Sequence, residues 1–182
     1  YGGAGMGLLG RTVIMEETGY TLFSAPFFST CVLAADIIEA FASEDDKADL
    51  LNKIASGDII ISALDGRGKL SLEDNKLNGT ISPATDAVHA DLILVATQNK
   101  DNDIVLTGYS PNTAGLSVTP YASIDPTRSQ AKVSFDNVSL SDGQAIGKTD
   151  ETAFSQTLQI AHGALAAECV GGGQKCLDMT LD

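Results

Sequence analysis

Short apolar segments between positions 57 and 138 constrain the fold of this chain more than any other feature. The clearest of them is 131–138, in which Ala131, Val133 and Phe135 alternate with polar side chains. Successive side chains of a strand point to opposite faces, so this alternation predicts a strand with one buried face. The middle of the chain is therefore expected to be a β region.

Two pairs of these segments are predicted to form hairpins. Residues 69–72 and 76–81 flank an acidic turn at 73–75, and residues 92–96 and 104–108 flank a turn rich in Asn and Asp. Further strands are expected at 59–61, 116–120 and 130–138. Because no helical pattern interrupts this series, it favours an antiparallel β-sandwich or barrel.

The segments before the β region have the 3.6-residue periodicity of helices. The first predicted helix covers residues 8–18, and the second covers residues 32–42 after an irregular apolar link. The second helix is expected to begin with Ser29 or Thr30 as its N-cap, since either hydroxyl could accept a hydrogen bond from a free backbone amide. This part of the chain is predicted to be helical throughout.

A third helix is predicted over residues 44–56. Ser43 precedes three acidic residues, so its hydroxyl can cap the helix while the acids stabilise the positive end of the helix dipole. Gly57 follows the helix and is a suitable C-terminal residue because glycine adopts the left-handed conformation without strain.

Helical periodicity returns after Asp150 and continues to about Leu181. This helix contains Gly163 and the run 171–173, and each glycine inside a helix costs roughly 1 kcal/mol relative to alanine. A helix that keeps such residues is expected to lie close to a neighbouring backbone. No further helix follows in the sequence, so we expect that neighbour to come from missing chain or another subunit.

Composition excludes several classes of function. The formal net charge of −13 argues against binding to nucleic acid or to anionic membrane surfaces. No apolar run approaches the ~20 residues that span a bilayer. Cys31, Cys169 and Cys176 lack metal-ligand spacing and are expected to be buried, reduced thiols of a cytoplasmic protein. His89 and His162 belong to no recognisable catalytic or metal motif.

Two motif matches are rejected. Residues 5–10 satisfy the dinucleotide fingerprint G-x-G-x-x-G, but no strand precedes them to direct the turn toward a diphosphate. The Asn- and Asp-rich segment 99–103 could suggest a calcium loop, but Ile104 and Ser110 occupy the positions that require Gly and Glu. We expect a solvated turn there, and no metal site.

The order of helices, β region and long glycine-containing helix resembles the acyl-CoA dehydrogenase family over almost the whole chain. The similar segments are Tyr1–Gly5 with Met15–Gly19, Ser43–Gly57, Leu77–Thr80 with Ala90–Val95, Asp125–Arg128 with Phe135–Val138, and Ala166–Thr180. The resemblance implies an α+β chain in three parts. Residues 1–56 would end an N-terminal helical domain, residues 57–148 would form the flavin-side β domain, and residues 149–182 would begin a C-terminal helical bundle. The sequence is then expected to be a fragment.

The family resemblance also implies a reaction, a cofactor and partners. Members bind FAD and an acyl-CoA thioester, and a glutamate removes the α-proton while the β-hydrogen leaves as hydride. Hydrogen bonds to the thioester carbonyl make that proton acidic. Family subunits assemble into homo- or hetero-oligomers, in which tetramers share flavin sites, and pass electrons to an electron-transfer flavoprotein.

The segment that corresponds to the family's flavin loop departs from its pattern. The family reads Leu-Thr-Glu-Pro-Gly-x-Gly-Ser-Asp, whereas this chain has Ala63-Leu64-Asp65-Gly66-Arg67-Gly68-Lys69. The next motif offers an aromatic residue and a threonine two positions later, and here Pro83 replaces the aromatic while Thr85 is kept. The cofactor contacts implied by the resemblance are Leu64, Asp65, Gly66, Pro83 and Thr85.

No catalytic base is assigned. One of the two family positions for the catalytic glutamate lies outside this sequence, and the other falls near Ala161, which has no glutamate within several residues. Glu168 lies in a segment that resembles a structural pattern of the family. Two functions remain open: an FAD-dependent acyl-CoA dehydrogenase, and a flavin-poor, non-catalytic partner subunit of a heteromeric one.

Overall fold

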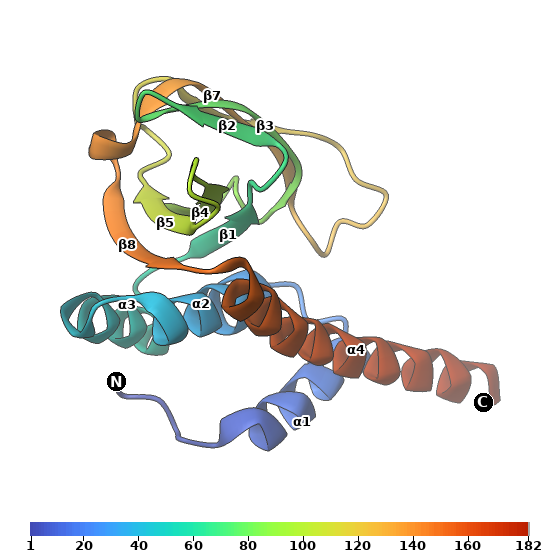
Figure 1. The fold of residues 1–182 in the computed structure, drawn as a ribbon. Coiled ribbons are helices and arrows are strands. Elements are labelled where there is room, and N and C mark those ends of the chain that lie inside the picture. Colours follow the sequence, from blue (N-terminus) through green and yellow to red (C-terminus); the bar gives the residue numbers. More distant parts are fainter. Residues whose placement is uncertain (182) are drawn as a thin grey trace.

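A β domain lies on a layer of helices in the computed structural model, which describes residues 1–181 (Figure 1). The helical elements are α1 (Gly7–Tyr20), the π-helix η1 (Phe28–Ala34), α2 (Ala35–Phe41), α3 (Glu44–Ser56), the short 3₁₀ helix η2 (Leu140–Asp142) and α4 (Glu151–Leu181). The strands are β1 (Ile61–Asp65), β2 (Leu70–Glu73), β3 (Lys76–Thr85), β4 (Leu92–Gln98), β5 (Ile104–Tyr109), β6 (Leu116–Pro120), β7 (Gln130–Ser139) and β8 (Gln144–Thr149). The predicted order of helices, β domain and long helix is confirmed.

Within residues 1–181 the strands form two sheets, with the orders β1-β4-β5-β8 and β2-β3-β7-β6. Both predicted hairpins are present, as the antiparallel pairs β2–β3 and β4–β5. The expectation of purely antiparallel pairing was wrong for β1, which pairs with β4 in parallel. A parallel pair needs a long crossover, and the β2–β3 hairpin of the other sheet supplies it.

Strand β8 was missed because its sequence gives a weak strand signal. Only Ile146 of this strand is buried, so the alternation of apolar and polar residues is lost. Gly147 faces the backbone of Phe41, and a Cβ at this position would come within 2.1 Å of the Phe41 carbonyl oxygen. The strand is thus fixed by close contact with α2 rather than by its own apolar pattern.

Strand β4 contributes to the core on both of its faces. Ile93 and Val95 pack in the cluster between the two sheets, and Leu94 and Ala96 pack in the cluster between the first sheet and the helices. Phe154 of α4 belongs to this second cluster and is almost fully buried. The core therefore continues from the outer sheet to the helical layer.

The prediction that Ser29 or Thr30 is an N-cap was wrong, since both lie inside η1. Their hydroxyls instead bind the β domain. Ser29 donates to the Asp86 carboxylate at 2.6 Å, and Thr30 donates to the carbonyl of Ile61 and accepts from its amide, both at 3.1 Å. Serine and threonine in the sequence could not reveal these distant partners.

The ends of α3 are as predicted. The Ser43 hydroxyl accepts a hydrogen bond from the Asp46 amide at 3.2 Å, and Gly57 has the left-handed conformation with φ of 79°. Both features follow from local chemistry that the sequence displays directly.

Helix α4 finds its neighbour within the chain, so the expectation that missing chain or another subunit must supply it was wrong. A Cβ at Gly171 would lie 1.8 Å from the Glu16 carbonyl oxygen, and one at Gly19 would lie 1.9 Å from that of Glu168. These glycines let the backbones of α1 and α4 touch, and Figure 1 shows α1 beneath α4. This close approach explains Gly171 and Gly19, whereas a Cβ at Gly163 or Gly173 meets nothing within 4 Å among the described residues.

Exposure of the cysteines differs from the expectation of buried thiols. Cys169 and Cys176 are exposed on α4, and Cys31 is half-buried in η1. Among residues 1–181, no His, Cys, Asp and Glu side chains are grouped so as to hold a metal ion. None of the described helices has the length and apolar character needed to cross a membrane.

Candidate functional site

A hollow of about 210 Å³ lies where η1 meets the ends of β1 and β3, and we call it the η1–β1–β3 pocket. The predicted cofactor contacts Leu64, Asp65, Pro83 and Thr85 line this pocket. Gly66 does not, because its amide donates to the Ala96 carbonyl at 2.9 Å and holds the backbone away from the hollow. The structure thus brings together predicted residues from two separate segments.

The helical side of the pocket was not found from the sequence. Phe28, Ser29 and Leu33 of η1 line it, together with Lys69 and Ile81 of the β domain. The segment containing Phe28 and Ser29 was interpreted as an irregular link. The apolar residues of this segment could have indicated a buried wall. The direction in which their side chains point, however, depends on the π-helical turn. Such turns are common at functional sites.

Thr85 places a hydroxyl on the pocket wall. Its side chain exchanges hydrogen bonds with the Gln130 amide group at 3.3 to 3.4 Å, and its carbonyl accepts one from the Ser62 hydroxyl at 2.8 Å. The latter bond ties the end of β3 to β1. The surrounding wall is mainly apolar, so the hydroxyl could orient a ligand while the wall excludes water.

Asp86 follows Thr85 and is only 6% exposed. Burial raises the pKa of its carboxyl group, although the hydrogen bond from Ser29 and the charges of Arg128 and His89 act in the opposite direction. The residue has φ of 59°, in the left-handed region. Asp86 therefore connects η1 to the β3–β4 turn at the edge of the pocket.

At the other end of the pocket, Arg67 gathers acidic partners from two elements. Its Nε and Nη2 atoms donate to the two Asp65 oxygens at 2.9 and 2.7 Å, and its Nη1 donates to Glu151 and, at 3.2 Å, to Ser155. The guanidinium carbon also lies 4.7 Å from the centre of the Phe154 ring. We call Asp65, Arg67 and Glu151 the Arg67 cluster.

The charges of the Arg67 cluster stabilise one another. Burial disfavours the ionised Asp65 carboxyl, but the hydrogen bonds and charge of Arg67 prevail and hold its pKa below the ordinary value. Hydrogen bonding to Asp65 and Glu151 raises the pKa of Arg67 despite partial burial. Asp65 and Arg67 therefore remain ionised at neutral pH.

Glu168 does not act at this pocket. It forms an ion pair with Arg128, which also lies 5.8 Å from the centre of the Phe28 ring. Among the residues that the structure describes, no glutamate lines the η1–β1–β3 pocket.

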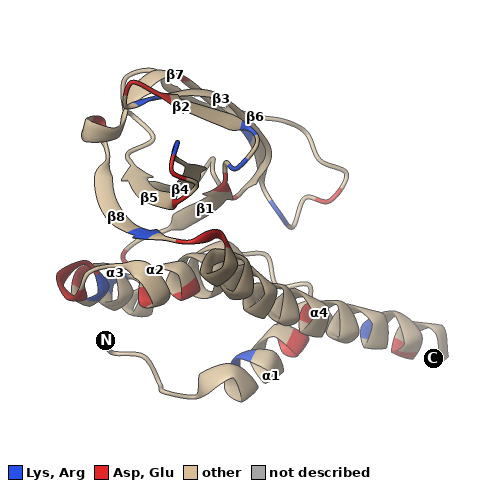
Figure 2. Ribbon diagram, in the orientation of Figure 1, with Lys and Arg blue, Asp and Glu red and all other residues tan. Residues whose placement is uncertain are grey.

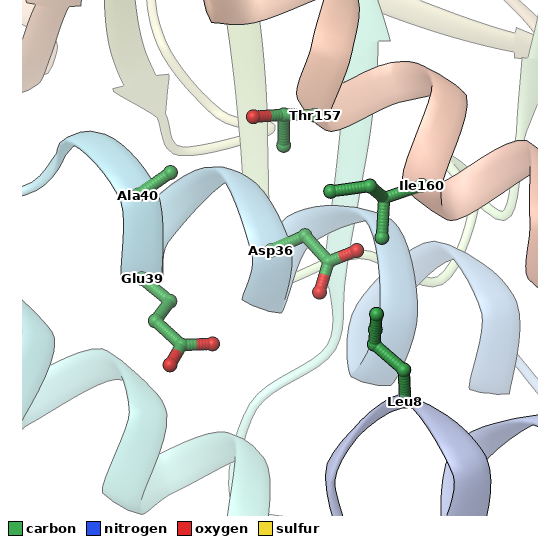
Figure 3. A pocket seen from close by; sticks show the side chains of 6 residues that line it. All are labelled: Leu8, Asp36, Glu39, Ala40, Thr157 and Ile160. Atoms are coloured by element: carbon green, nitrogen blue, oxygen red, sulfur yellow. The ribbon is translucent and has the colours of Figure 1, made fainter.

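A second hollow, of about 260 Å³, lies between α1, α2 and α4 (Figure 3). Asp36 extends its carboxylate between Leu8 and Ile160, and Arg11 pairs with one of its oxygens at 2.5 Å. The other oxygen is buried without a hydrogen-bond partner among residues 1–181. Burial raises the pKa of this carboxyl group, with the contacts from Arg11 opposing the shift.

The sequence and the fold were compared with those of known proteins. The profile described as "Acyl-CoA dehydrogenase, N-terminal domain" matches residues 1–58. The acyl-CoA dehydrogenase IpdE2 of Mycobacterium tuberculosis is 29% identical over 182 residues, which are 100% of this chain and 46% of that protein. Residues 1–58 therefore resemble the N-terminal domain of the acyl-CoA dehydrogenase family, and the whole chain is similar in sequence to one of its members.

Solved structures share the fold of this chain. The ChsE4–ChsE5 complex of M. tuberculosis has a TM-score of 0.85 at 21% identity, over 99% of this chain and 50% of that one. A glutaryl-CoA dehydrogenase of Mycobacterium smegmatis in complex with FADH2 has a TM-score of 0.74 at 19% identity, over 96% and 48%. The chain thus spans about half the length of these acyl-CoA dehydrogenase relatives.

The pocket suits one part of the family cofactor, FAD, and not another. Its apolar wall and the Thr85 hydroxyl fit an edge of the flavin ring, although its volume is below the roughly 300–1,000 Å³ of complete ligand sites. A diphosphate needs free backbone amides or free cations. The Arg67 cluster offers a cation that already has acidic partners. The lining of the pocket therefore suits an apolar ring edge better than a diphosphate.

Proposed function

We propose that this chain is a subunit of an FAD-dependent acyl-CoA dehydrogenase, which converts an acyl-CoA thioester to the enoyl-CoA. The observation that carries the proposal is the convergence of Leu64, Pro83 and Thr85 on one pocket between η1, β1 and β3. These residues come from the two segments that resemble the family's flavin-contacting motifs.

In this proposal, the contribution of the chain to the reaction is to hold and orient the flavin ring. The apolar side chains of Leu64 and Pro83 would exclude water from one edge of the flavin, and the Thr85 hydroxyl would hydrogen-bond to that edge. When bound, FAD supplies the acceptor for the hydride that leaves the β-carbon. The α-proton would pass to a glutamate from outside residues 1–181.

The proposal extends to location and partners. Family assemblies suggest a homo- or hetero-oligomer in the cytoplasm, with an electron-transfer flavoprotein as the electron acceptor. The similar M. tuberculosis structure is a complex of ChsE4 with ChsE5, which supports a heteromeric arrangement as one form of this proposal.

A flavin-poor partner subunit is the second candidate function. The Arg67 cluster in place of the family's flavin loop favours it, because a cation with two acidic partners is poorly suited to a cofactor phosphate. Such a subunit would shape the site of an active homologue without holding the flavin itself.

The visible spectrum of the purified full-length product separates the two candidates. A yellow protein that bleaches on addition of an acyl-CoA supports the dehydrogenase, whereas a colourless protein that gains flavin only with a co-expressed homologue supports the partner subunit. Thr85→Val should shift the flavin band or weaken flavin retention. Thr80→Val is the matched control, because Thr80 is exposed on the same strand and bonds to Ser134.

A further inference from the structure

We propose that the β1–β2 turn of this chain rejects the diphosphate of a dinucleotide because the Arg67 guanidinium is already paired with Asp65 and Glu151, so that only the flavin ring is recognised at this face. The inference rests on the proposed function, since it assumes that the ring edge lies in the η1–β1–β3 pocket. Asp65 lines that pocket and belongs to the Arg67 cluster, so a tail that leaves the ring at this end meets the cluster.

The guanidinium of Arg67 has little capacity left for a phosphate. Of its five N–H groups, two donate to Asp65, one to Glu151 and one to Ser155. The side chain is only 18% exposed and is held against the Phe154 ring. A phosphate would therefore have to displace carboxylates that are already aligned with the guanidinium.

Four backbone amides of the turn are also engaged. The amide of Gly66 donates to Ala96, those of Lys69 and Leu70 donate to the Gly66 carbonyl at 3.0 and 2.8 Å, and that of Arg67 donates to the Asp65 carboxylate at 3.1 Å. Phosphate-binding turns leave successive amides free to point at the anion. Here the Asp65 side chain takes the place of such an anion.

The charges at the start of α4 also disfavour the binding of a diphosphate. Asp150 caps this helix by accepting a hydrogen bond from the Ala153 amide at 2.9 Å, and Glu151 follows it. Figure 2 shows this acidic segment leading into α4. Asp65 and Glu151 both contact the Arg67 guanidinium, and Asp150 directly precedes Glu151, so a diphosphate would add negative charge to a region that is already net negative.

Lys69 is the cation that could oppose this conclusion, because it lines the pocket and its side chain is exposed. An exposed amine binds a phosphate weakly, since both ions remain hydrated and are screened by salt. The Lys69→Met variant measures this contribution separately from that of Arg67.

Binding of ADP tests the inference without requiring the ring. In calorimetric titrations the unmodified chain should bind ADP with a Kd above about 1 mM. The double variant Asp65→Asn/Glu151→Gln should bind ADP at least about tenfold more tightly because Arg67 is released, and adding Arg67→Met should abolish this gain. Tight ADP binding by the unmodified chain that is lost in Arg67→Met would overturn the inference, as would a double variant that gains nothing.

A matched control removes the same charge elsewhere. Asp49→Asn/Asp103→Asn eliminates two carboxylates, one exposed and one partly exposed, that pair with Lys53 and Lys148, and it should leave ADP binding unchanged. An equal gain in this control would also overturn the inference, because net charge alone would then explain the effect. If the double variant fails to fold, the single variant Glu151→Gln serves instead, since this side chain is 54% exposed.

Riboflavin binding tests the proposed function separately. The unmodified chain should quench the fluorescence of riboflavin, FMN and FAD with affinities within about threefold of one another, because the phosphates add nothing. FAD binding more than about tenfold tighter than riboflavin binding would overturn the inference. Failure of riboflavin to bind would refute the ring contact of the proposed function, while the ADP titrations would still decide the inference about the turn.

Discussion

Replacing Gly171 by alanine should destabilise the protein although alanine is the better helix former. At this position of α4 a Cβ would lie 1.8 Å from the Glu16 carbonyl oxygen and 2.9 Å from the Tyr20 amide nitrogen. Both are backbone atoms of α1, so no side chain can rotate away to relieve the clash. A normal non-bonded approach is roughly 3.3 Å. The two helices must therefore separate by more than about 1 Å to restore van der Waals contact.

The magnitude follows from two opposing effects. Alanine for glycine inside a helix gains about 1 kcal/mol, while overpacking of a close contact typically costs about 1–3 kcal/mol, and more where backbone must move. The α1–α4 contact also holds the cluster of Met15, Val32 and Ala161. We expect the cost to exceed the gain, giving a net loss of about 1–2 kcal/mol in the free energy of unfolding.

Gly173→Ala in the same helix is the control, because a Cβ there meets nothing within 4 Å among the described residues. It should stabilise by up to about 1 kcal/mol. The assay is urea denaturation followed by circular dichroism, supported by thermal melts in which about 1 kcal/mol shifts Tm by roughly 2–4 °C for a chain of this size. The packing argument fails if Gly171→Ala stabilises the chain as much as Gly173→Ala does.

The remaining predictions concern a cap, a buried acid and the thiols. Ser43→Ala removes the N-cap of α3 and should cost about 1 kcal/mol in the free energy of unfolding by urea denaturation; an unchanged midpoint would show that the acids behind it suffice. The pKa of Asp86 is raised in the folded chain, so this group's contribution to stability falls as pH rises through the window between its unfolded pKa, about 3.9, and its folded pKa. Asp86→Asn should therefore become more stable relative to the unmodified chain across that rise, and a pH-independent difference would contradict the reasoning. At pH 8, Cys169 and Cys176 should react quickly with a disulfide reagent and Cys31 slowly, because burial raises the pKa of the Cys31 thiol; mass spectrometry of partly labelled protein identifies the order.

Local chemistry explains which elements could be predicted from the sequence. Strand β7 alternates between buried and less buried residues from Ala131 to Phe135, and α3 carries its own cap and its own C-terminal glycine. The parallel pairing of β1 with β4 could not be read in the same way, since a short apolar run has the same appearance in either direction. The hydroxyls of Ser29 and Thr30 suggested a cap because serine and threonine favour that role, whereas their actual partners lie 57 and 31 residues away.

Prediction of the candidate site had a similar limit. Resemblance to family motifs selected Leu64, Pro83 and Thr85, which meet in one pocket. The helical wall depended on the π-helical turn, and the Arg67 cluster depended on the approach of α4, 84 residues further along the chain, to the β1–β2 turn. Long-range placement of charged side chains has no periodic signature, so only the folded chain reveals it.

Burial of β4 on both faces has a consequence for cooperativity. A rigid strand whose alternate side chains belong to two cores transmits the loss of either core to the other, because Ile93 and Leu94 are neighbours on one backbone. The helical layer and the two sheets should thus melt in one transition, and slow amide exchange should be strongest in β4. A molecule bound at the η1–β1–β3 pocket would lie between the helical layer and the sheets, and it would stabilise both layers against unfolding.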